Sequence, residues 1–216
     1  RGLDDDTLPV AILPLGTANV LALDLGLARN VAGALRTIEG GRTTALDVAE
    51  VNGTLSFLVT GIGLDAAAVA EVERVRRGPI SKSTYAWAML RALRNYREPQ
   101  LTVELDGARV AGPVGAVLIA NIVHYGGVFH LDAQRVLDDG LFEVYLFRRA
   151  SIAAMAAAAT RAFIANLPGG SCEMQRAARV RVVAPEPVPY HVDGDFGGTT
   201  PLDFAVSPRR RRILIP

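Results

Sequence analysis

The sequence predicts a mostly β protein, in which an antiparallel β-sandwich follows a short α/β segment. Short runs of apolar and β-branched residues recur from Thr43 to the C-terminus, and Gly, Pro, Asn or Asp separates most of them. Two of the separators, Asn52-Gly53 and Asp106-Gly107, are typical of two-residue β-hairpin turns. Many short strands joined by tight turns favour a sandwich.

The N-terminal segment is expected to hold one strand and two helices. An apolar run predicts a strand at residues 9–14, and a helix is expected after Thr17. Residues 30–39 predict a second helix, because Asn30 is a favourable N-cap and Gly40-Gly41 a favourable stop.

The sandwich is expected to be built from short strands that two helices interrupt. The predicted strands are residues 45–51, 55–61, 101–105, 114–120, 141–147, 180–183, 190–192 and 202–206. One predicted helix covers residues 83–96, where large apolar side chains recur at helical spacing. The other covers residues 151–167, is rich in alanine and ends at Pro168-Gly169-Gly170.

The composition is that of an ordinary globular protein. Half of the residues are hydrophobic, 21% are charged and the net charge is +1, so nothing draws the whole chain toward nucleic acid. Cys172 is alone, which excludes an intrachain disulfide and favours a cytoplasmic protein. Three scattered histidines make a poor zinc signature. The apolar run at residues 152–160 is too short to cross a membrane, which takes about 20 residues.

The segment Pro14-Leu15-Gly16-Thr17-Ala18-Asn19 carries the first functional signal. It lies between an apolar run and a predicted helix, where free backbone N–H groups and the helix dipole suit an anion. We therefore predict one side of a phosphate site at Gly16, Thr17 and Asn19. The alternative is an ordinary helix N-cap.

Further segments in the same order resemble one family. They are Gly61-Ile62-Gly63-Leu64-Asp65-Ala66, Ala120-Asn121, Tyr125-Gly126-Gly127-Val128-Phe129, Leu137-Asp138-Asp139-Gly140-Leu141 and His191-Val192-Asp193-Gly194-Asp195. Together with Gly16-Thr17 they resemble the diacylglycerol kinase catalytic-domain family, which includes sphingosine kinases. The likeness runs from residue 9 to the C-terminus. It implies that residues 1–42 are a remnant of the α/β ATP-binding domain, residues 43–205 a lipid-binding β-sandwich, and residues 206–216 a tail that returns to the first domain.

The resemblance also implies a Gly-Gly-Asp-Gly-Thr nucleotide loop upstream. No such string occurs among the 216 residues. The chain is therefore expected to be the C-terminal portion of a longer kinase and, alone, a poor one. In many relatives an Asp follows the Asn at position 19, whereas here the residue is Val20.

Asp138-Asp139-Gly140 is a candidate metal loop. The resemblance implies a structural Mg²⁺ bound by Asp139 and by the carbonyl oxygens of Val136 and Leu141, which are the hard oxygen ligands that Mg²⁺ prefers. The alternative from the residues alone is a plain Asp-Gly turn.

Two further carboxylates have roles by resemblance. The family's usual Val-Asp-Gly-Glu string ends in a Glu that resembles a proton acceptor for the lipid hydroxyl, and Asp195, one methylene shorter, takes that place as the predicted catalytic base. Asp65 is predicted to bind the lipid substrate; the alternative is that it caps the helix that begins at Ala66. The sequence Asp193-Gly194 also suits a turn between strands.

The function predicted from these features is ATP- and Mg²⁺-dependent phosphorylation of a hydroxyl of diacylglycerol or a related membrane lipid. The expected location is the cytoplasmic side of the inner membrane. Arginines around Trp87 are expected to touch an anionic membrane, or else to form a solvated helix face. We also leave open that the chain forms a homodimer. The rival hypothesis is a non-catalytic lipid-binding module of the same fold.

Overall fold

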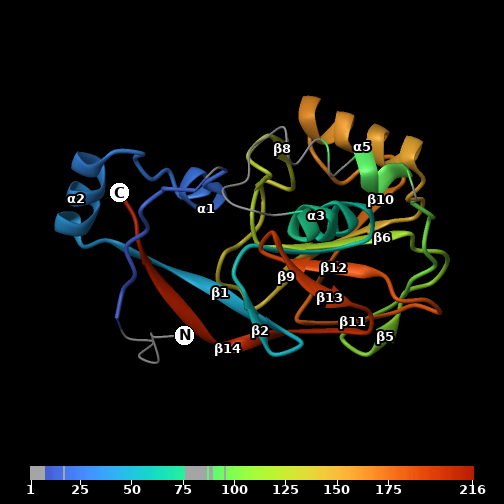
Figure 1. Cartoon of the computed structure of the whole chain (residues 1–216). Helices are drawn as coiled ribbons and strands as arrows, with labels where there is room; N and C mark the ends of the chain where they lie inside the picture. Colours follow the sequence, from blue (N-terminus) through green and yellow to red (C-terminus); the bar gives the residue numbers. More distant parts are fainter. Residues whose placement is uncertain (1–7, 17, 76–86, 88–89, 95) are drawn as a thin grey trace.

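The computed structural model describes residues 8–16, 18–75, 87, 90–94 and 96–216. Within these ranges two six-stranded antiparallel sheets form a sandwich (Figure 1). The first sheet has the order β2 (Thr54–Ser56), β1 (Thr43–Val51), β14 (Leu202–Leu214), β11 (Arg179–Val183), β4 (Thr102–Leu105), β5 (Ala108–Arg109). The second has the order β10 (Cys172–Ala177), β9 (Phe142–Phe147), β6 (Ala116–Ala120), β3 (Val59–Ile62), β12 (Pro189–Val192), β13 (Asp195–Thr199). A small hairpin pairs β7 (His124–Tyr125) with β8 (Phe129–His130). The sandwich predicted from the sequence is therefore confirmed.

The main core lies between the two sheets. Phe142 of β9 and Phe204 of β14 meet edge to face, with ring centroids 5.1 Å apart, so the two sheets touch through these rings. The second sheet is also covered on its other face, where Tyr145 and neighbouring apolar residues pack against Met155 and Ala162. Burial on both faces explains why β6 reads as a continuous apolar run, whereas β11 alternates between exposed and buried residues.

The helices have local causes in the sequence. They are α1 (Val20–Asp24), α2 (Val31–Gly40), α3 (Leu64–Val75) and α5 (Ile152–Ile164), and residues 90–94 are also helical. The Asn30 side chain accepts a hydrogen bond from the Gly33 N–H at the start of α2, as expected of an N-cap. Ser151 caps α5 in the same way by accepting from the Ala154 N–H. Of the helix predicted at residues 83–96, residues 87 and 90–94 are helical, residue 96 is not, and the others lie outside the described residues.

Both predicted two-residue turns form. Asn52 and Gly53 have φ angles of 48° and 83° between β1 and β2, and Asp106 and Gly107 have φ angles of 50° and 87° between β4 and β5. These left-handed angles suit a hairpin because they match the twist of the strands. The strands β10 and β13, which the sequence did not predict, lie at the two edges of the second sheet.

Of three further predictions about local structure, two were wrong and one was confirmed. The apolar run at 9–14 does not form a strand; Val10 alone bridges Ile213 of β14. The helix expected after Thr17 does form, and it begins at Val20. The single strand expected at 55–61 is divided into β2 and β3, because the backbone N–H groups of residues 57–59 donate to the Asp193 carboxylate.

The last strand is longer than predicted. β14 was expected at 202–206 but continues to Leu214, and it pairs with β1 along most of its length. Figure 1 shows β1 and β14 running together out of the sandwich toward α2 and the C-terminus. Beyond β14, the Ile215 N–H donates to the Arg42 carbonyl. The tail therefore ends beside the N-terminal segment.

Candidate functional site

Asp65 lies at the start of α3, directly after β3. Gly63 turns the chain between the two elements with a φ of +121°, an angle that favours glycine. Gly61 lies beneath the site, where a Cβ atom would collide with the Asp65 carboxylate and the His191 ring. The two glycines of the Gly61-Ile62-Gly63 segment thus make the turn and the space that Asp65 needs.

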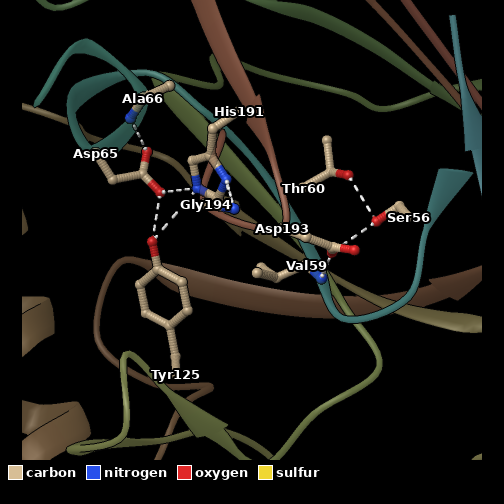
Figure 2. Close-up of polar contacts among 9 residues, drawn as sticks. All are labelled: Ser56, Val59, Thr60, Asp65, Ala66, Tyr125, His191, Asp193 and Gly194. Atoms are coloured by element: carbon tan, nitrogen blue, oxygen red, sulfur yellow. Dashed lines mark hydrogen bonds and ion pairs between the residues drawn. The ribbon is translucent and has the colours of Figure 1, made fainter. Parts of the chain in front are cut away.

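Three groups donate hydrogen bonds to the Asp65 carboxylate (Figure 2). Oδ2 accepts from the Tyr125 hydroxyl at 2.8 Å and lies 3.1 Å from His191 Nε2, while Oδ1 accepts from the Ala66 N–H at 2.8 Å. Burial would raise the pKa of Asp65, but the hydrogen bond and charge of His191, with the bonds from Tyr125 and Ala66, hold the pKa below its ordinary value. Asp65 is therefore an ionised carboxylate at neutral pH. Its side chain stays 23% exposed, which leaves one edge open to a substrate.

His191 connects Asp65 to the turn between β12 and β13. Its side chain is buried, and its Nδ1 accepts a long hydrogen bond of 3.4 Å from the Gly194 N–H. The other ring nitrogen, Nε2, is the one that faces the Asp65 carboxylate and donates to it. The sequence reading of an ordinary, satisfied histidine is right about its burial, but it did not foresee the contact with Asp65.

Asp193 fixes that turn to the segment that leads into β3, the neighbouring strand of the second sheet. Its carboxylate accepts hydrogen bonds from the backbone N–H groups of Phe57, Leu58 and Val59 at 2.8 to 2.9 Å, and Ser56 Oγ lies 3.2 Å away. These N–H groups cannot join a strand ladder, which is why the predicted strand at 55–61 is interrupted. Figure 2 shows the Asp193 and Asp65 contacts on either side of β12.

Asp195, the predicted base, is the first residue of β13 and pairs with Val192 across the turn. Its side chain is exposed, and among the described residues no hydrogen bond or ion pair reaches its carboxylate. The structure places it one turn away from His191 rather than within the Asp65 network. Its role as a base stays a prediction.

Two of the predicted nucleotide-binding residues, Gly16 and Asn19, hydrogen-bond to each other. The Gly16 N–H donates to Asn19 Oδ1 at 2.7 Å, and Asn19 Nδ2 donates to the Gly16 carbonyl at 2.6 Å. Asn19 is the residue before α1, in a left-handed conformation, and not part of the first helical turn as expected. Thr17 lies outside the described residues. Gly127 of the β7–β8 turn approaches the Ala18 carbonyl, so this loop sits beside the hairpin that carries Tyr125.

A buried carboxylate that the sequence did not single out holds α1 to the sandwich. Asp24 accepts hydrogen bonds from the Val123 and His124 N–H groups and from Arg135 at 2.9 Å, and it also pairs with the His124 ring. Burial would raise the pKa of Asp24, but these bonds and the Arg135 charge hold the pKa below its usual value. Asp24 thereby places the Gly16–Asn19 loop near the β7–β8 hairpin.

The predicted metal residues lie together in the loop before β9. Asp139 Oδ1 accepts a hydrogen bond from the Leu141 N–H at 3.0 Å, and Val136 lies on the exposed part of the loop. The loop is held to the first sheet by Asp47, which accepts from the Gly140 N–H at 2.6 Å and from Arg210 at 2.8 Å. The Asp138-Asp139-Gly140 sequence is thus a turn in this structure, and its metal binding stays a prediction.

The residues of this loop fit a hard cation. Among the described residues, the one ion pair of Asp139 Oδ2 is with Arg176, at 3.9 Å, so this oxygen keeps lone pairs for a ligand. Nearby, Glu143 is buried with Oε2 unpartnered among the described residues, and burial together with the Asp139 charge raises the pKa of Glu143 to about 7 even though Arg176 lowers it. Among the described residues no three His, Cys, Asp or Glu side chains cluster as a metal site, so a cation here depends on carbonyl oxygens as well.

A cavity opens beside the start of α3. It has a volume of about 630 Å³ and is lined by Gly63, Ala67, Tyr96 and segments near residues 97–100 and 184–189. The Tyr96 hydroxyl is buried with no partner among the described residues, and burial, with the charges of Glu98 and Asp65, raises its pKa. A polar group of a bound molecule can satisfy this hydroxyl.

Comparisons with known proteins agree with this architecture. The model of the YegS C-terminal NAD kinase beta sandwich-like domain matches residues 58–215, and that of the diacylglycerol kinase catalytic domain matches residues 1–51. An uncharacterized protein of Synechocystis is 26% identical over 97% of this chain, and a diacylglycerol kinase of Bacillus subtilis is 24% identical over 98%. The chain spans 50% of the first and 71% of the second.

The fold recurs in a solved structure. A diacylglycerol kinase from Bacillus anthracis superposes with a TM-score of 0.69 at 16% identity, over 96% of this chain and 67% of that one. Within the described ranges, no helix has the length and apolar character that a membrane crossing requires.

Proposed function

Because the chain belongs to the lipid kinase family of the YegS C-terminal NAD kinase beta sandwich-like domain, we propose that it binds the acceptor in an ATP-dependent lipid kinase. The reaction transfers the γ-phosphoryl group of ATP to a hydroxyl of diacylglycerol or a related membrane lipid. The observation that carries the proposal is the ionised, partly exposed Asp65 carboxylate, which Tyr125, His191 and the Ala66 N–H hold in place. The alternative of a non-catalytic lipid-binding module is not favoured by the comparisons, although Val20 and Asp195 depart from the family's usual residues.

Asp65 is the residue that binds the lipid hydroxyl in this proposal. Its Oδ2 already accepts from Tyr125 and His191, so the carboxylate is fixed in orientation before a lipid arrives. A hydroxyl that donates to its open edge is held in one place, and such fixed positioning lowers the barrier to transfer. The cavity lined by Gly63, Ala67 and Tyr96 would receive another part of the lipid, with the Tyr96 hydroxyl as a polar partner.

Asp195 is the proposed proton acceptor. As the hydroxyl oxygen forms its bond to the γ-phosphorus, the bond from that phosphorus to the bridging oxygen of ADP breaks, and the hydroxyl proton passes to the Asp195 carboxylate. The exposure of Asp195 and the lack of a partner among the described residues leave its carboxylate available for this role. The three hydrogen bonds from residues 57–59 to the Asp193 carboxylate fix the turn that carries Asp195.

Gly16, Thr17 and Asn19 would supply one side of the nucleotide site. Asp139, with the carbonyl oxygens of Val136 and Leu141, would hold Mg²⁺ at the edge of the same region. When bound there, Mg²⁺ supplies positive charge that orders an acidic loop. The chain's own contribution is to pin that loop through Asp47 and Arg210.

We also propose a peripheral location at the cytoplasmic face of an anionic membrane. Arg91 lies over the Trp87 ring with its guanidinium carbon 4.7 Å from the centroid, which joins a cation to an aromatic side chain on one surface. Such pairs suit the interfacial region of a bilayer.

The test is a phosphorylation screen of the protein as its gene encodes it. Labelled ATP and Mg²⁺ are supplied with a panel of diacylglycerols, monoacylglycerols and sphingoid bases. We expect one lipid class to be labelled and the Asp65→Asn variant to lose ~100-fold or more in kcat/KM. The control is Asp203→Asn, which removes an exposed acid that pairs with Arg181 on the outer face of the first sheet. Labelling of no lipid, or full activity of Asp65→Asn, would refute the proposal.

A further inference from the structure

Helix α5 has one face on the sandwich and one face in solvent, and both are apolar. Met155, Ala158 and Ala162 recur at helical spacing and pack against the second sheet. The opposite face carries Ile152, alanines at 153, 156 and 157, Phe163 and Ile164. A surface helix in a globular protein normally turns a polar face outward, so the second apolar face is unexplained by packing within the described residues.

The exposed end of α5 is the most apolar part of this face. Phe163 is 62% exposed and Ile164 is 76% exposed. The helix contains no acidic residue, and its one charged residue is Arg161, whose guanidinium lies against Gly169. Just before the helix, Arg149 is exposed and lies 3.6 Å from Glu98. An apolar surface bordered by arginines matches an anionic lipid surface in both hydrophobicity and charge.

This end of α5 adjoins the hairpin of the candidate site. After α5, the Leu167 N–H donates to the His130 carbonyl of β8 at 3.0 Å. The turn of the same hairpin carries the exposed Val128, and its first strand carries Tyr125, which bonds to Asp65. Figure 1 shows α5 and β8 along the same side of the molecule. A surface that rests on α5 and on the hairpin turn would lie next to the place where Asp65 meets a lipid hydroxyl.

We propose that the exposed face of α5, together with Val128, is the docking surface for an anionic lipid bilayer. This inference rests on the proposed function, because a lipid substrate must be reached at a membrane. The Ile152, Phe163 and Ile164 side chains enter the acyl boundary, and Arg149 and Arg161 meet the headgroups. A protein partner is the less favoured occupant, because the face offers no acidic side chain and, apart from the bordering arginines, only Thr160 as a hydrogen-bonding side chain.

The experiment measures vesicle binding of the 216-residue chain by sedimentation, without ATP. The probes are vesicles of phosphatidylcholine with phosphatidylglycerol and vesicles of phosphatidylcholine alone. We expect stronger binding to the anionic vesicles and a loss of about tenfold or more in the partition coefficient for the double variant Phe163→Ser, Ile164→Ser. Both side chains are exposed, so the fold should survive, and thermal unfolding checks it.

The matched control is Leu35→Ser, Ile38→Ser on α2. These side chains are 52% and 48% exposed, so the control removes exposed apolar surface of the same kind at another place. We expect the control to change partitioning less than about twofold. Equal losses in both double variants, unchanged binding of the α5 variant, or no binding of the wild-type chain would overturn the proposal. So would a wild-type dimer in analytical ultracentrifugation that the α5 variant alone dissolves, because a second copy would then be the occupant.

The result is separable from the phosphorylation screen. Vesicle binding needs no phosphoryl transfer, so binding that depends on α5 in a protein that labels no lipid would refute the proposed function and leave the docking surface standing. The reverse outcome, lipid labelling without binding that depends on α5, would refute the docking surface alone.

Discussion

The N-terminal arm (residues 8–42) and the sandwich that follows it use the same kinds of residue in opposite ways. Apolar side chains of the sandwich strands fill the core, whereas many of those in the arm face solvent, namely Leu8, Leu13, Leu15, Leu23, Val31, Leu35 and Ile38. The sandwich also builds the Asp65 network from its own strands and turns. In the arm, Gly16 and Asn19 bond to each other.

This difference indicates that the lipid side of the proposed site is held in place by more contacts than the nucleotide side. The carboxylate for the lipid is oriented by residues from α3, β7 and β12, all within the sandwich. The arm has few anchors of its own, chiefly the buried Asp24 and the bridge of Val10 to Ile213. The predictions below test these anchors and the network, from the largest expected effect to the smallest.

Asp24→Ala should separate the arm from the sandwich. The variant leaves Arg135 buried without its carboxylate and the Val123 and His124 N–H groups without an acceptor, which lowers the free energy of unfolding by about 3 kcal/mol. Hydrogen exchange should quicken most in α1, while β6 and β9 keep their protection. Glu39→Ala, an exposed acid at the end of α2, is the control. Equal loosening of β6 would show that the arm and the sandwich are one cooperative unit.

Asp193→Ala should weaken the sandwich from within. Three backbone N–H groups lose their acceptor, and because water reaches part of the site, we expect a loss of about 2 kcal/mol in denaturant unfolding. Asp203→Ala provides the comparison at an exposed position. If the free energy of unfolding falls no more than in the control, the hydrogen bonds to Asp193 contribute nothing to stability.

Tyr125→Phe and His191→Gln should each raise the pKa of Asp65. Each removes a hydrogen bond to the charged form or the charge of His191, so a rise of about one unit is expected in carboxyl NMR titrations. Because the native pKa lies below the ordinary 3.8, Asp65 contributes stability above about pH 4 and loses it as the pH falls through the native value. The variants should therefore be less stable than wild type at pH 7 and approach it at low pH. An unchanged pKa in both would contradict the network.

Asp139→Ala should remove the response of the chain to Mg²⁺. A ligand that binds only the folded state at ten times its Kd adds about 1.4 kcal/mol, so wild type should show a small rise in Tm with Mg²⁺. Asp138→Ala is the matched neighbour and should keep most of the rise. If both variants respond like wild type, the Asp138-Asp139-Gly140 sequence is a turn only.

Local features of the fold followed from the sequence, whereas long-range ones did not. The Asn52-Gly53 and Asp106-Gly107 turns were predicted because they depend on neighbouring residues. The break at residues 57–59 was missed, because its cause is Asp193, more than 130 positions away. The apolar run at 9–14 has the composition of a strand, but only Val10 finds a partner strand.

The candidate site shows the same division. Asp65 and the region of Tyr125 and His191 were located through motifs in the sequence. Their contacts were not, because Tyr125 and His191 reach Asp65 across 60 and 126 positions. No sequence signal pointed to Asp24, whose partners come from the loops near residues 123 and 135.

The most direct test of the central claim is an amide NMR titration of the 216-residue chain with two ligands, a water-soluble short-chain diacylglycerol and Mg²⁺-ATP. The claim is that the lipid side is formed in the sandwich, while the nucleotide side is incomplete in the arm. We predict that the diacylglycerol shifts the amides of Gly61, Ala66 and Gly194 and that Asp65→Asn abolishes these shifts. Mg²⁺-ATP should bind with a Kd weaker than about 1 mM. Micromolar ATP affinity, or a lipid titration that leaves the neighbours of Asp65 unshifted, would contradict the account.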